Sequence, residues 1–129
     1  MKQGRSSIIF RNWVLIPLFL ISQGILLFTA LMPLKGRTAA KLFSGPLPHL
    51  AAFFITAMLA CMILDNFKIK IYYIIGLLYS FCVSIFVEYL QEYLTSYRSF
   101  EKIDIFYGTL GAFSFVVLDR IIYFVFRKK

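Results

Sequence analysis

Four apolar runs divide this chain of 129 residues, and nearly all of its ionisable side chains stand at the ends of the runs. The runs cover residues 13–34, 48–64, 71–91 and 103–126. A helix of about 20 apolar residues crosses the hydrocarbon core of a bilayer. Because 60% of the residues are hydrophobic, too few polar side chains remain to cover a water-soluble core. The pattern predicts an all-α integral membrane protein, in which residues 1–129 form one domain of four transmembrane helices in an antiparallel bundle.

The net charge of +8 has an explanation in such a protein. Lys and Arg gather at membrane–water boundaries, where they anchor helices and attract anionic lipid. A soluble protein of this charge would suggest nucleic acid as a partner. In a chain made of membrane spans, we expect no nucleic-acid partner.

Positive residues are more numerous on the side of the predicted bundle that holds both chain ends. That side carries eight of them: Lys2, Arg5, Arg11, Lys68, Lys70, Arg127, Lys128 and Lys129. The other side carries five: Lys35, Arg37, Lys41, Arg98 and Lys102. Because segments rich in Lys and Arg tend to stay in the cytoplasm, we expect both ends of the chain to be cytoplasmic.

Polar residues from three of the runs are expected to meet at the opposite face, which this orientation makes the outer one. His49 begins the second run, Glu88 and Gln91 end the third, and Asp104 begins the fourth. Arg98 stands in the segment between the third and fourth runs. Helices of alternating direction bring these positions to one membrane face, although they are far apart in the sequence.

Glu88 ends a stripe of small and polar residues in the third run. Gly76, Ser80 and Ser84 precede it at intervals of four, so all lie on one helical face. Lipid tails cannot satisfy an ionised carboxylate, so this face must turn toward other helices or a wet cavity. A functional site and a purely structural ion pair both agree with this pattern.

The same residues form an ordered motif. Its elements are His49, Glu88-Tyr89-Leu90-Gln91, Arg98-Ser99-Phe100, Asp104-Ile105 and Thr109-Leu110-Gly111-Ala112. In order and spacing the motif resembles the VanZ-like family, and the resemblance covers residues 48–112. Two features depart from the family pattern, since Gly45 and Pro46 replace an Asp-Lys pair and Gly108 replaces an asparagine.

The resemblance implies a cell-envelope protein of the bacterial cytoplasmic membrane, related to the response to glycopeptides such as teicoplanin. It implies no defined reaction. The residue types favour binding of a membrane lipid, an anionic one or a wall-precursor lipid. Arg98 can hold a phosphate in a fork, Glu88 and Asp104 can orient the ligand, and His49 and Gln91 can add hydrogen bonds.

Other functions stay open at this point. Glu88 and Asp104 could act as general acid and base, but no nucleophile motif, HExxH or phosphate loop accompanies them, so an enzyme is not favoured. We expect no cofactor and no metal, because the charge of Arg98 opposes a cation. The main alternative is a small accessory subunit of a membrane-protein complex, in which another membrane protein is the partner and the polar cluster is structural. A transporter with Glu88 as a proton site needs more spans than one copy offers.

Overall fold

Four long helices make up the described part of the chain. The computed structural model describes residues 3–32, 46–96 and 99–126, with the backbone alone for residues 3–10. Within these ranges there is no strand, and the helices are α1 (Gln3–Leu31), α3 (Pro46–Asn66), α4 (Tyr72–Leu94) and α5 (Lys102–Phe126). Each helix is long and apolar enough to cross a membrane. The predicted all-α, four-helix membrane fold is therefore confirmed.

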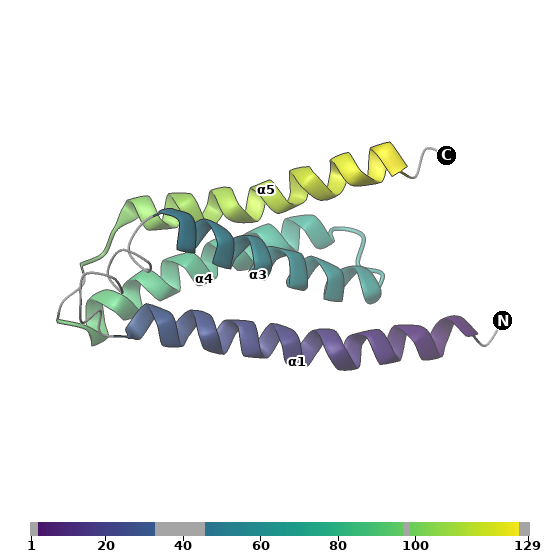
Figure 1. The fold of residues 1–129 in the computed structure, drawn as a ribbon, viewed down its shortest axis with the longest axis horizontal. Helices are drawn as coiled ribbons and strands as arrows, with labels where there is room; N and C mark the ends of the chain where they lie inside the picture. Colours follow the sequence, from purple (N-terminus) through teal and green to yellow (C-terminus); the bar gives the residue numbers. More distant parts are fainter. Residues whose placement is uncertain (1–2, 33–45, 97–98, 127–129) are drawn as a thin grey trace.

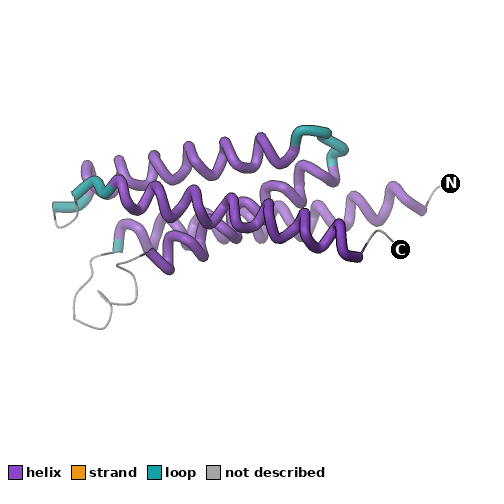
Figure 2. The backbone as a smooth tube through the Cα atoms, turned by 90° about the horizontal axis from the view of Figure 1, so that it is seen from above, coloured by secondary structure: helices purple, strands orange, loops and turns teal. Residues whose placement is uncertain are grey.

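The helices lie side by side along one axis and alternate in direction, with α3 and α4 between α1 and α5 (Figure 1). One end of the bundle gathers the end of α1, the start of α3, the end of α4 and the start of α5. The other end holds both chain ends and the short α3–α4 connection, which Figure 2 shows from above. This alternation brings residues that are distant in sequence to one end of the molecule.

The α3–α4 connection turns within a few residues. Lys68 has a left-handed φ of 61°, a conformation typical of the residue that follows a helix end. Its N–H donates to the carbonyl of Asp65 at 2.9 Å, and the N–H of Ile69 donates to the carbonyl of Leu64 at 3.2 Å. These bonds satisfy carbonyls that the end of α3 leaves open.

The largest helix–helix interface lies between α3 and α5, and small residues allow it to be close. A Cβ atom at Gly111 of α5 would collide with the backbone carbonyl of Leu50 in α3. Beside this contact, Ala57 and Ala112 are almost completely buried. The ring of Phe115 packs edge-on against Phe54 at a centroid distance of 5.7 Å, so aromatic packing continues the interface.

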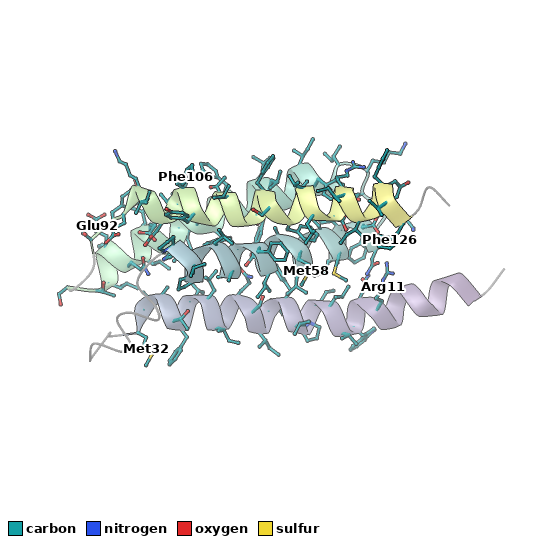
Figure 3. All side chains as sticks on the ribbon, turned by 45° about the horizontal axis from the view of Figure 1, so that its top comes forward. Arg11, Met32, Met58, Glu92, Phe106 and Phe126 are labelled. Atoms are coloured by element: carbon teal, nitrogen blue, oxygen red, sulfur yellow. The ribbon has the colours of Figure 1, made fainter. Side chains whose placement is uncertain are left out.

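Large apolar side chains cover the outside of the bundle (Figure 3). Phe106 and Phe126 of α5 are 59% and 75% exposed, and Trp13 of α1 is 75% exposed. A water-soluble protein rarely exposes contiguous apolar surface of this kind. The bilayer is the solvent that satisfies it, which agrees with a multi-pass membrane protein.

Helix α1 is joined to its neighbours through polar side chains. The amide of Gln23 donates to the Thr56 hydroxyl of α3 at 3.2 Å, and the Tyr79 hydroxyl of α4 donates to the Gln23 carbonyl oxygen at 3.3 Å. Near the chain ends, the Asn66 amide donates to the side-chain oxygen of Asn12 at 2.7 Å. Interhelical hydrogen bonds of this type stabilise helix pairs in lipid, where burial of apolar surface does not favour helix association.

Candidate functional site

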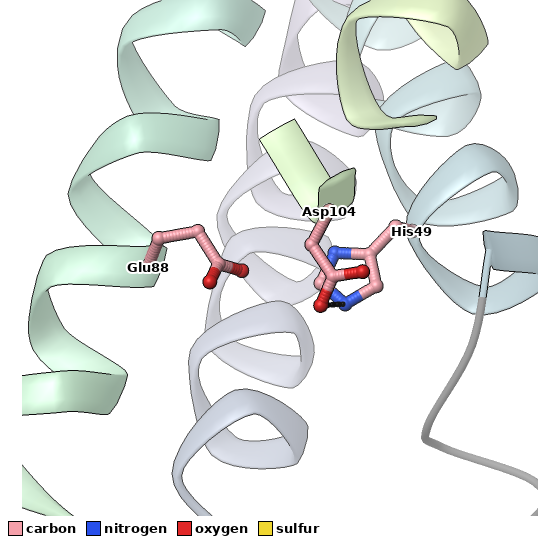
Figure 4. A group of neighbouring side chains, drawn as sticks. All are labelled: His49, Glu88 and Asp104. Carbon is pink, nitrogen blue, oxygen red and sulfur yellow. Dashed lines mark ion pairs between the residues drawn. The ribbon is translucent and has the colours of Figure 1, made fainter. Parts of the chain in front are cut away.

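Three ionisable side chains from three helices meet at the end of the bundle that lies away from the chain ends (Figure 4). His49 stands in the first turn of α3, Glu88 near the end of α4 and Asp104 in the first turn of α5. One ring nitrogen of His49 and one oxygen of each carboxylate all lie within 4.8 Å of one another. The alternating helix directions account for this convergence.

His49 and Asp104 form a close pair. The Nε2 atom of His49 lies 3.1 Å from Oδ2 of Asp104, and the two side chains are only 10% and 16% exposed. A carboxylate in the first turn of a helix is also favoured by the helix dipole. The pair therefore joins the start of α3 to the start of α5 in a largely buried place.

Glu88 is the most buried member of the cluster, at 1% exposure. Its Oε2 atom accepts a hydrogen bond from the backbone N–H of Glu101 at 3.1 Å. Its Oε1 atom is buried and has no hydrogen-bond partner among the described residues. The carboxylate points toward Asp104 and His49 (Figure 4). Because buried carboxylate oxygens are costly without a partner, this oxygen marks a place for a donor or a cation.

Gln91 lies next to this cluster, but its side chain bonds to α1 and not to the three ionisable residues. Its amide donates to the backbone carbonyl of Ala30 at 3.1 Å, which joins the end of α4 to the end of α1. With His49 and Thr29, Gln91 lines a small cavity of about 40 Å³ between α1, α3 and α4. A cavity of that size has room for water. Gln91 therefore supports the wall beside the site, and the shared cluster consists of the other three side chains.

Arg98, the remaining predicted site residue, lies outside the described residues. The role that the sequence suggests for it stays a prediction.

Gly108 of α5 lies close to side chains of α3 and α4. An added Cβ atom would lie 2.7 Å from Oγ of Ser84 and 2.8 Å from Cδ2 of Phe53. Phe53 is completely buried, and Oγ of Ser84 is another buried atom for which the described residues offer no hydrogen-bond partner. A larger side chain at this position would need both neighbours to move. The ring of Phe53 therefore fills the space beside Gly108.

Sequence reasoning missed the part that Glu101 takes in the site. Its backbone N–H, and not its side chain, orients the Glu88 carboxylate. A backbone donor carries no signature in residue type, so no motif could have indicated it.

A second polar contact lies at the opposite end of the bundle. The Tyr73 hydroxyl of α4 donates to Asp119 of α5, and the Arg120 guanidinium lies 4.6 Å from the centroid of the Tyr73 ring. A cation over an aromatic face is attracted by the ring. Both charged residues that interrupt the fourth apolar run thus engage one tyrosine, and α4 and α5 are joined there.

The scan against protein-family models and the searches of curated proteins and solved structures find no match to this chain. Fold and site define a multi-pass helical membrane protein with a buried polar cluster at one end of its bundle. The VanZ-like resemblance remains a prediction that its motif residues carry.

Proposed function

We propose that this protein is a VanZ-like membrane protein of the bacterial cell envelope that binds the headgroup of a lipid or of a lipid-linked wall precursor. One observation carries the proposal: Oε1 of Glu88 is buried without a partner among the described residues and faces a cluster contributed by three helices. A hydrogen-bond donor on a bound molecule would offset the desolvation of this acceptor. The cluster lies at an end of the bundle, where lipid headgroups are found.

The charge distribution supports a location at the outer face. In the sequence, more Lys and Arg residues flank the span ends on the side of the chain ends than flank the opposite span ends, which favours cytoplasmic chain ends. The cluster end would then face the outside of the cytoplasmic membrane. Wall precursors and the targets of glycopeptides occupy that face, so a precursor ligand would connect the protein to the glycopeptide response.

The residue types narrow the chemistry of the headgroup. Glu88 and Asp104 accept hydrogen bonds from hydroxyl or ammonium groups. Arg98, three residues before Glu101 in the chain, offers a guanidinium fork for phosphate. A headgroup that joins phosphate to an amine or a sugar supplies both kinds of group. Such a headgroup fits the cluster better than an anion alone.

The accessory-subunit alternative also has an observation in its favour. The His49–Asp104 pair and the bond from Glu101 to Glu88 both join helix ends to each other. A cluster that served only this purpose would stabilise the bundle and bind no headgroup. Substitutions in it would lower stability and leave the bound lipids unchanged.

Native mass spectrometry of the tag-free protein separates the two functions. We expect the wild type to retain a phosphate-bearing lipid. Glu88→Gln and Arg98→Ala should each retain at least about tenfold less of it, since one hydrogen bond to a charged group is lost in each. Glu92→Gln is the matched control, because Glu92 is exposed on the same helix and loses the same charge. Equal retention by all four proteins would contradict headgroup binding.

A further inference from the structure

We infer that His49, Glu88 and Asp104 form a site for one divalent transition-metal ion of the zinc or manganese type. This inference goes beyond headgroup binding, although both start from the open Oε1 atom of Glu88. It also departs from the sequence-based expectation of no metal, which relied on the charge of Arg98. Within the part of the chain that the structure describes, the cluster brings together two carboxylates and an imidazole, which is a ligand set.

The geometry of the cluster is close to that of a metal site. Ligands bound about 2.1 Å from a zinc ion in tetrahedral arrangement are about 3.4 Å from one another. Nε2 of His49 and Oδ2 of Asp104 are 3.1 Å apart, which suits two ligands of one ion. The candidate atoms of all three residues lie within 4.8 Å of one another, so small side-chain rotations would bring them around one ion.

Glu88 provides a second and independent observation. Its side chain is 1% exposed, its Oε1 atom has no hydrogen-bond partner in the described ranges, and its carboxylate points into the cluster (Figure 4). The backbone N–H of Glu101 holds the other oxygen, as hydrogen bonds commonly orient carboxylate ligands from outside a metal site. One carboxylate oxygen is thus fixed by the protein and the other is left for a ligand.

Electrostatics favour a cation with two positive charges. Two carboxylates held close together in a buried site repel each other. A divalent ion between them cancels both charges and supplies a partner for Oε1 of Glu88. A neutral hydrogen-bond donor would satisfy that atom but leave the repulsion in place.

The ligand types indicate the class of metal. Imidazole nitrogen suits zinc, iron, nickel and copper, whereas carboxylate oxygen suits magnesium, calcium and manganese. One nitrogen with two oxygens, and no sulfur among the three, favours zinc or manganese over Cu(I). Three protein ligands leave a coordination position for water or for an oxygen atom of a bound molecule.

Zinc titration of metal-free, tag-free protein in detergent micelles tests the inference. We expect one saturable equivalent of Zn²⁺ in the wild type, measured by equilibrium dialysis and elemental analysis. Glu88→Gln should bind at least about tenfold more weakly, since a neutral amide replaces a ligating carboxylate. Glutamine still accepts the bond from the Glu101 N–H, so this variant is expected to fold. Glu92→Gln should bind like the wild type.

Two results would overturn the inference: no saturable binding to the wild type, or equal binding by the wild type and Glu88→Gln. Absorption of the Co²⁺-loaded protein gives a second measurement that is independent of folding yield. Its d–d bands should change in Asp104→Asn and persist in Glu92→Gln, and bands identical in all three proteins would also overturn it. The lipid content of the same preparations is measured separately, so failure of metal binding and failure of headgroup binding are distinguishable.

Discussion

His49 and Asp104 connect the starts of two helices that are distant in sequence, with Nε2 of the imidazole 3.1 Å from Oδ2 of the carboxylate. The same two helices, α3 and α5, share the largest interface in the bundle. The pair therefore joins the two helices that contact each other most extensively. Its closeness to Glu88 makes one structural contact part of a larger cluster.

Energetic coupling between His49 and Asp104 is the first prediction. We expect the single changes His49→Ala and Asp104→Ala to be non-additive, with a coupling free energy of about 1–3 kcal/mol, because the 3.1 Å contact between the two side chains is lost only once in the double variant. The measurement is a double-mutant cycle of reversible unfolding in mixed micelles. Additive effects would show that the two side chains do not interact.

Glu88→Gln should keep or raise stability. The amide still accepts the bond from Glu101, and an unpaired carboxylate is removed from a buried place. We expect the free energy of unfolding without added ligand to rise by about 1 kcal/mol. Functional groups commonly carry such a stability cost. Glu92→Gln, on the exposed face, should change the free energy of unfolding by less than about 0.5 kcal/mol.

If the free energy of unfolding of Glu88→Gln instead falls by about 1 kcal/mol, the carboxylate has a structural partner. The accessory-subunit function would then be favoured over ligand binding.

The close approach of α3 and α5 predicts a contrast between two glycines. In Gly111→Ala the new methyl group meets the Leu50 backbone carbonyl, which cannot rotate away, so we expect a loss of about 2 kcal/mol or more. At Gly24 of α1, an added methyl group would meet no described atom of a neighbouring segment within 4 Å, so Gly24→Ala should be neutral or stabilise by up to about 1 kcal/mol. Thermal unfolding of both variants tests the contrast, and similar losses would contradict the packing.

The helix count could be predicted from the sequence because a bilayer admits only long apolar helices or closed barrels. The helix ends could not be predicted to the residue. The first apolar run begins at residue 13, but α1 begins at Gln3, since backbone hydrogen bonds continue a helix past its apolar part. Asp119 and Arg120 likewise interrupt a run without ending α5, and the contacts of both with Tyr73 of α4 give their charges a partner inside the bundle.

Part of the site could be predicted from the alternating direction of the four spans. Alternating spans bring the ends of runs together, so the sequence places His49, Glu88 and Asp104 at one end of the bundle, while their contact depends also on how each helix is rotated. The partner of Gln91 depends on how α4 is rotated, and sequence spacing alone does not fix that rotation. The bond from the Glu101 N–H depends on where the backbone of the α4–α5 connection lies.

Orientation in the membrane is tested by labelling from one side. In a background with Cys61→Ala and Cys82→Ser, the exposed Ser99 near the cluster is changed to cysteine. We expect an impermeant thiol reagent to label it in intact cells, because the charge distribution places this end outside. Lys70→Cys, exposed at the other end, should react only after the cells are opened. Reversed labelling would place the cluster at the cytoplasmic face.

NMR of the imidazole tests most directly whether His49, Glu88 and Asp104 share one site. The chain has a single histidine, so ¹⁵N-histidine labelling of tag-free protein gives the imidazole signals of His49 alone. Measured by NMR at one fixed pH, these signals should shift in both Asp104→Asn and Glu88→Gln and stay in place in Glu92→Gln. Signals unchanged by Glu88→Gln and Asp104→Asn would contradict the shared site.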